Sequence, residues 1–247
     1  MRQEVPGMPG VRSFPDRAAM GAAAAADIAE ELRSRLSAQG AVRVIFAAAP
    51  SQSDMLDRLV AAPGVDWTRV TAFHMDEYIG LAADDPARFA NWLDRAIFTR
   101  LPFAEVHRID PEADPATYAK LLAEAPIDVV CLGIGQNGHL AFNDPPVADL
   151  DDPEDVKIVE LDRTCRQQQV DDGAFPTFAD VPTHAVTLTI PRLLNATRLF
   201  CVVPGAAKRQ AVEQALHAPI SAADPATALR THPDVTLYLD AEADPRG

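Results

Sequence analysis

Apolar runs and amphipathic stretches alternate along almost the whole chain. Short apolar runs predict buried strands at 42–48, 69–75, 106–109, 127–134, 157–161, 184–190, 198–204 and 235–240. Stretches with helical spacing lie between them and predict helices at 17–39, 54–61, 86–101, 116–125, around 165–170 and at 205–218. Several strands are apolar on both faces, which is typical of a parallel sheet covered on both sides. The pattern therefore predicts an α/β fold: a single doubly wound, mostly parallel, Rossmann-like sheet with helices on both faces.

The pattern shows no repeat and no internal boundary. A chain of 247 residues is long enough to build one large α/β core. Only the first dozen residues, residues 146–156 and the last few lack regular spacing. We therefore expect a single domain over residues 1–247.

Composition limits the classes of molecule that the protein is expected to bind. A formal net charge of −14 disfavours nucleic acid and anionic membranes, although a local site can still be positive enough for a sugar phosphate. No apolar run is long enough to span a bilayer. The three cysteines are odd in number and have no metal-type spacing, which favours a reducing, cytoplasmic location without disulfides. No cluster of histidine, cysteine and carboxylate predicts a metal site.

Polar residues follow four of the predicted strands. In an open parallel sheet, ligands bind beyond the carboxyl ends of the strands. The segments at those positions are PSQS (50–53), MDEY (75–78), GQNGHLAFND (135–144) and PGAAK (204–208). We expect them to form four walls of one pocket.

The first candidate is the acidic pair Asp76 and Glu77. Adjacent side chains on an extended backbone face opposite ways, so one of the two is expected to face the pocket. A carboxylate there can act as a base. The alternative is an acidic turn with no chemical role.

The second candidate is His139, whose ordinary pKa suits proton transfer near neutral pH. Asp144 lies five residues further on and is able to orient the imidazole. Nearby glycines, including Gly138, permit a tight turn and close approach of the backbone to a ligand. The alternative is a structural histidine in a glycine-rich turn.

Two further segments are candidates for binding an anion. Ser51, Gln52 and Ser53 lie between a strand and a helix, where hydroxyls and free N–H groups favour an anion. Lys208 lies in the first helical turn after a strand, where a cation is unfavourable because it opposes the helix dipole. A bound phosphate would explain why a lysine stands at this position. The alternatives are that Ser53 only caps the helix and that Lys208 is an ordinary solvated lysine.

The segments MDEYIGL (75–81) and GIGQNGHLAFNDP (133–145) together resemble the glucosamine-6-phosphate deaminase (isomerase) family, which shares its fold with 6-phosphogluconolactonases. Weaker similarity extends over nearly the whole chain. The resemblance implies aldose–ketose isomerisation with release of ammonia, without a metal or another cofactor. It makes Asp76 the base that moves a proton between C1 and C2. It makes His139 the ring-opening group, Asp144 and Asn137 its supporting relay, and Lys208 a phosphate ligand.

The chain departs from the family pattern at three places. The phosphate loop, usually rich in glycine and threonine, is AAAPSQS (47–53) here. A family arginine that grips phosphate has no exact counterpart in TCRQQQVDDGAF (164–175). Arg166 lies near its position, and a glutamine lies nearer. Asp144 stands where the family usually has glutamate. We therefore expect Ser51, Gln52, Ser53, Lys208 and Arg166, with the backbone at Gly138, to hold the substrate.

The resulting hypothesis is a cytoplasmic amino sugar phosphate deaminase/isomerase that converts glucosamine 6-phosphate and water, or a related amino sugar phosphate, to fructose 6-phosphate and ammonia. Its expected partner is a small-molecule sugar phosphate, and it is a possible homo-oligomer. A 6-phosphogluconolactonase is the first alternative, although Tyr78 stands where those relatives have arginine. A non-catalytic sugar-phosphate sensor is the second, although the chain has no DNA-binding segment before its first predicted helix.

Overall fold

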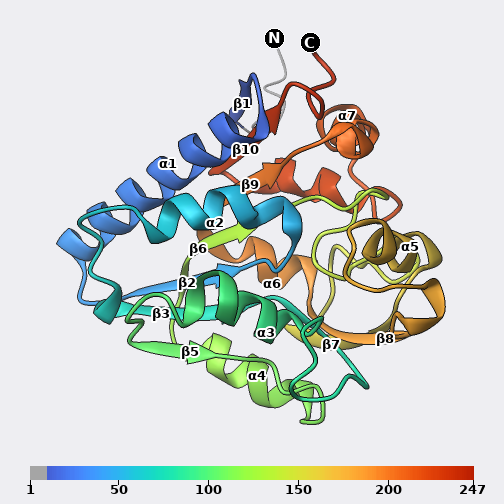
Figure 1. Cartoon of the computed structure of the whole chain (residues 1–247), viewed down its shortest axis with the longest axis horizontal. Coiled ribbons are helices and arrows are strands. Elements are labelled where there is room, and N and C mark those ends of the chain that lie inside the picture. Colours follow the sequence, from blue (N-terminus) through green and yellow to red (C-terminus); the bar gives the residue numbers. More distant parts are fainter. Residues whose placement is uncertain (1–9) are drawn as a thin grey trace.

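A seven-stranded sheet forms the centre of the computed structural model, which describes residues 10–247. The strands are ordered β1-β10-β9-β6-β2-β3-β5, and every neighbouring pair is parallel (Figure 1). Their bounds are β1 (Gly10–Phe14), β2 (Val42–Phe46), β3 (Val70–His74), β5 (Glu105–His107), β6 (Ile127–Leu132), β9 (Ala196–Val203) and β10 (Val235–Asp240). The predicted fold class is confirmed.

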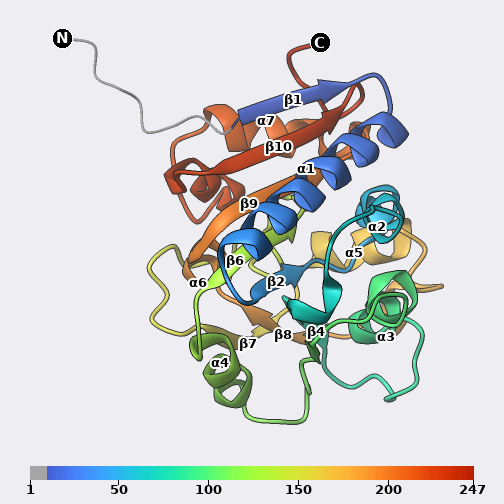
Figure 2. The same ribbon diagram turned by 90° about the vertical axis from the view of Figure 1, so that its left-hand side faces the viewer.

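Helices cover both faces of this sheet (Figure 2). One face packs against α1 (Arg17–Ala38), α2 (Ser53–Val60) and α3 (Phe89–Leu93). The other packs against α4 (Pro115–Ala123), α6 (Ile190–Leu194) and α7 (Arg209–His217). Alternation along β2 shows why both layers are needed, because Val44 and Phe46 face the first layer and Ile45 faces the second.

A second, three-stranded antiparallel sheet lies beside the main one. It consists of β4 (Asp76–Tyr78), β8 (His184–Leu188) and β7 (Val156–Glu160). The strands predicted at 157–161 and 184–190 therefore exist, but they belong to this small sheet. Its edge strand β7 is only half buried, and the side chain of Ile158 is 53% exposed. This is typical of an antiparallel sheet with one face exposed to solvent.

Other segments differ from the sequence-based expectation in extent. The edge strand β1 spans Gly10–Phe14, and its residues 10–12 belong to the first dozen residues, which were expected to lack regular structure. The rest of that expected segment lies outside the described residues. The helix predicted over 86–101 begins at Phe89 and continues after Leu93 as a π-helical segment, Asp94–Phe98. The polar helix after β7 is α5 (Arg163–Asp171).

The strand order determines where the polar segments meet. Strands β9, β6, β2 and β3 are consecutive neighbours in the sheet, so the loops after all four emerge at the same edge. Within residues 10–247, no helix is long and apolar enough to cross a membrane.

Candidate active site

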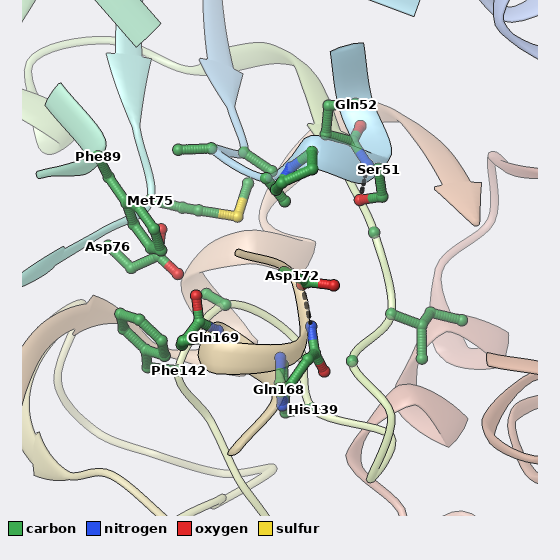
Figure 3. Close-up of a pocket in the computed structure, with 18 of the residues that line it drawn as sticks. Ser51, Gln52, Met75, Asp76, Phe89, His139, Phe142, Gln168, Gln169 and Asp172 are labelled. Atoms are coloured by element: carbon green, nitrogen blue, oxygen red, sulfur yellow. Dashed lines mark hydrogen bonds between the residues drawn. The ribbon is translucent and has the colours of Figure 1, made fainter. Parts of the chain in front are cut away.

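The four loops surround one pocket of about 560 Å³, open mouth included. Residues 47–52 follow β2, Met75 and Asp76 follow β3, and residues 133–135 and His139 follow β6 (Figure 3). Lys208 follows β9. The expectation that these loops form walls of one pocket is confirmed. A further wall comes from α5, which contributes Gln168, Gln169 and the residue just after the helix, Asp172.

Asp76 is the carboxylate that faces the pocket. It is 6% exposed, and Met75, Phe89 and Phe142 lie around it (Figure 3). Its carboxylate accepts no hydrogen bond from the described residues. Burial, and secondly the charge of the neighbouring Glu77, raise the pKa of Asp76 well above its ordinary value. A carboxylate with a raised pKa is a stronger base, which suits the removal of a proton from carbon.

Glu77 points the other way, as the alternation along a strand requires. Its carboxylate accepts backbone N–H groups from Tyr78 and Phe89 at 3.0 Å and from Ala90 at 2.9 Å. These bonds hold the first residues of α3 against β4. They also set the position of Phe89 in the pocket wall, so Glu77 has a structural role.

His139 is held in one orientation by two oxygen atoms. Its Nδ1 lies 2.7 Å from Oδ1 of Asn137 and 3.0 Å from Oδ1 of Asp144. Both neighbours are acceptors, so Nδ1 carries the proton and Nε2 is the free lone pair of the neutral ring. A Cβ atom at Gly135 would lie 2.1 Å from the imidazole ring, so glycine is required for the ring to occupy this place.

Asp144 and Asn137 support the histidine from behind. Burial by itself would raise the pKa of Asp144, but hydrogen bonds from His139, the Asn137 amide and the Asp162 N–H outweigh burial and lower it. The carboxylate therefore stays ionised and holds the imidazole in place. It also stabilises the positive charge that forms when Nε2 takes a proton.

Lys208 is placed at the pocket by the tight turn after β9. The N–H of Gly205 donates to both carboxylate oxygens of Asp240 at 3.0 Å, which fastens this turn to the end of β10. Lys208 is only 8% exposed, and burial lowers its pKa to about 8, partly offset by the charge of Asp172. The ammonium group is thus largely protonated at neutral pH.

Ser51 and Gln52 also line the pocket, as expected. The Gln52 amide donates to the Ser51 hydroxyl and to the Val202 carbonyl, both at 3.1 Å. Ser53 and Gly138 do not line it, which corrects the sequence-based expectation for both. Ser53 is the first residue of α2 and faces a different hollow, and Gly138 has a φ of +82° in the turn that leads to His139.

Arg166 also lies outside the pocket, which corrects the expectation that it holds the substrate. Its guanidinium group donates to the carbonyls of Phe178 and Val181 at 3.0 and 2.7 Å and stacks over the Phe178 ring. The arginine therefore fastens the segment before β8 to α5.

Three residues of the α5 wall were not predicted as site residues. Gln169 accepts the Tyr78 hydroxyl at 2.7 Å, and Gln168 donates to Asp172 at 3.2 Å. With the buried Cys165, these residues recur at intervals of three and four and so lie on one helical face. That spacing was the available signal in the sequence.

The described residues include one group of donor types that metals use. Ligand atoms of His139, Asp144 and Cys165 lie within 4.8 Å of one another. Burial, and secondly the neighbouring Asp144 carboxylate, raise the pKa of the Cys165 thiol well above its ordinary value. A metal binds the thiolate, and the Asp144 oxygens are already engaged by hydrogen-bond donors, so this group fits a relay better than a metal site.

The chain matches the family model described as glucosamine-6-phosphate isomerases/6-phosphogluconolactonase over residues 15–238. It is 35% identical over 209 residues to a glucosamine-6-phosphate deaminase of Listeria welshimeri, covering 83% of this chain and 87% of that protein. It is 32% identical over 223 residues to a glucosamine-6-phosphate deaminase of Streptococcus pneumoniae, covering 87% of this chain and 92% of that protein.

Solved structures of other proteins have the same fold as this chain. A monomeric glucosamine-6-phosphate deaminase superposes with a TM-score of 0.87 at 25% identity, covering 95% of this chain and 98% of the other. A 6-phosphogluconolactonase from Shewanella baltica superposes with a TM-score of 0.77 at 19% identity, covering 95% and 100%. The second similarity concerns the fold alone.

Proposed function

The chain belongs to the family of glucosamine-6-phosphate isomerases and 6-phosphogluconolactonases, and we propose that it is an isomerising deaminase of an amino sugar phosphate. The observation that carries the proposal is the pairing of Asp76 and His139. A desolvated carboxylate and a free imidazole Nε2 line the same pocket, and Lys208 also lines it. Two proton-transfer groups and one cation suit a sugar that must be opened, isomerised and held by an anionic end.

The reaction begins with ring opening. His139 takes the proton of the anomeric O1 hydroxyl and gives it to the ring oxygen O5, so the C1–O5 bond breaks and C1 becomes the aldehyde carbon of the open chain. Its Nε2 is able to do this because Nδ1 is already committed to Asn137 and Asp144. The relay keeps the same tautomer ready for each turnover.

Asp76 then transfers a proton from C2 to C1. Breaking the C2–H bond and adding a proton to the aldehyde oxygen O1 gives an enolamine, and protonation at C1 with loss of a proton from nitrogen leaves an imine at C2. Water adds to this imine, and the C–N bond breaks to give the ketose and ammonia. The apolar wall of Met75, Phe89 and Phe142 keeps the carboxylate desolvated and therefore basic.

A lactonase needs a base for water but no proton transfer between carbons. The two deaminases reported above, at 32% and 35% identity, favour the deaminase over the lactonase. The loops that line the pocket follow strands of one continuous sheet, so we also propose that the chain forms a single domain.

The first test is ammonia release by the purified protein from glucosamine 6-phosphate, with galactosamine 6-phosphate and 6-phosphogluconolactone in parallel. Ammonia from either amino sugar supports the proposal and identifies the preferred configuration at C4. Hydrolysis of the lactone without ammonia from either sugar contradicts it.

Asp76→Asn tests the role of the base directly. We expect kcat to fall roughly 10²- to 10⁴-fold, because the amide keeps the size of the side chain but cannot accept a proton. The raised pKa of Asp76 means that folding favours its protonated form, so this group costs the folded state progressively more as pH rises above the ordinary aspartate range. The melting temperature of Asp76→Asn should therefore exceed that of wild type by a margin that grows with pH. An Asp76→Asn protein with wild-type turnover would refute the mechanism.

A further inference from the structure

The end of the pocket away from Asp76 has its own set of polar groups. Ser51, Gln52 and Asp172 lie there, across the pocket from Asp76 (Figure 3). Lys208 also lines the pocket, close enough to Asp172 for the carboxylate to influence its pKa. We call these four residues the distal end. A substrate whose C1 and C2 lie at Asp76 extends its far substituent toward it.

The distal end carries one positive and one negative group. Among residues 10–247, Lys208 is the only lysine or arginine that lines the pocket. Asp172 lines the same pocket, and its charge is the largest favourable influence on the Lys208 ammonium. The two charges offset each other, so the distal end is close to neutral.

Asp172 is exposed, but a hydrogen bond ties its carboxylate to the pocket wall. Gln168 donates from its amide nitrogen to the Asp172 carboxylate at 3.2 Å. The amide oxygen of Gln168 accepts the backbone N–H of Gln136 at 2.9 Å, which fixes the glutamine itself. Gln168 is 7% exposed, so this tether is part of the pocket wall.

A phosphate and a hydroxyl interact differently with a neutral distal end than with a positive one. A phosphate monoester carries about 1.5 to 2 negative charges at pH 7, more than one lysine shared with an aspartate neutralises. A sugar hydroxyl, in contrast, can donate to a carboxylate and accept from an ammonium group at the same time. We propose that Asp172 is a specificity-determining residue that makes the distal end neutral, so that the enzyme also turns over the unphosphorylated amino sugar. This inference rests on the proposed deaminase function.

The kinetic test compares kcat/KM for glucosamine 6-phosphate with kcat/KM for glucosamine. We expect the ratio in the wild type to be below about 10², the effect of one or two charged hydrogen bonds. Asp172→Asn should raise the ratio about tenfold, mainly by improving the phosphorylated substrate. The matched control is Asp171→Asn, because Asp171 is the preceding residue, is exposed and bonds to Gln167 outside the pocket. A large wild-type preference for phosphate that Asp172→Asn leaves unchanged would overturn the proposal.

A binding test separates this inference from the proposed function. Inorganic phosphate, titrated into each protein by calorimetry, should bind about tenfold more tightly to Asp172→Asn than to the wild type, with Asp171→Asn unchanged. Equal phosphate affinity in the wild type and Asp172→Asn overturns the inference even if ammonia is released. If no variant releases ammonia from either sugar, the proposed function is wrong, and the phosphate titration still decides whether Asp172 neutralises the distal end.

Discussion

At the scale of single residues, the chemistry depends on how tightly two titratable side chains are held. Asp76 is desolvated by the walls around it, and His139 is oriented by two oxygens behind its ring. The His139 ring cannot shift without losing its contacts with Asn137 and Asp144, and Asp76 borders the pocket. Small steric changes beside them should therefore affect turnover more than stability.

Gly135→Ala tests this at the histidine. The added Cβ would lie 2.1 Å from the imidazole ring, so the ring must shift away from its two partners. We expect kcat to fall roughly 10²-fold, which is the effect of misplacing a catalytic group by about 1 Å. The control is Gly40→Ala, since a Cβ at Gly40 meets no atom within 4 Å. Equal activity of the two variants would show that the ring position is not required.

At the scale of elements, the short strand β4 joins Asp76, the proposed base, to the rest of the fold. It presents Asp76 to the pocket and Glu77 to the start of α3, so one three-residue strand positions both the base and part of the apolar wall. The buried Glu77 carboxylate accepts three N–H groups, and two of them, from Phe89 and Ala90, lie in the first turn of α3 and have no partner within the helix.

Glu77→Gln should weaken this junction. An amide keeps one acceptor but turns an N–H₂ group toward a backbone donor, so a buried N–H loses its partner. We expect the free energy of unfolding to fall by roughly 1–3 kcal/mol, measured by urea denaturation. Glu112→Gln is the matched control, because Glu112 is exposed and its side chain makes no hydrogen bond with the described residues. If both substitutions have the same small effect, Glu77 does not anchor α3.

At the scale of the whole molecule, the net charge of −14 opposes the approach of an anionic substrate. The pocket itself carries one lysine against this background. Salt shortens the range of the repulsion, because the Debye length falls from about 30 Å at 10 mM to about 8 Å at 150 mM.

Raising the NaCl concentration over that interval should therefore increase kcat/KM for glucosamine 6-phosphate, by roughly twofold. Glucosamine carries no negative charge, so its kcat/KM should not rise and serves as the comparison. A decrease for the phosphorylated sugar would mean that attraction to Lys208, and not the overall charge, governs its approach.

The sequence by itself determined six of the seven strands of the main sheet, all but the edge strand β1, and the segments that follow them. Asp76, His139, Asp144 and Lys208 were all identifiable because they lie in loops at the carboxyl ends of apolar strands. The physical reason is local: a strand fixes the position of the residue that follows it, and neighbouring parallel strands end at one edge of the sheet.

Only the tertiary structure decided which face of α5 meets the pocket. Successive residues of a helix point about 100° apart, so the turn of the helix about its axis is set by packing. Here Cys165 packs into the core, which brings Gln169 and Asp172 to the pocket and turns Arg166 toward the carbonyls of Phe178 and Val181. The charge of the distal end therefore follows from long-range packing, which neighbouring residues in the chain do not determine.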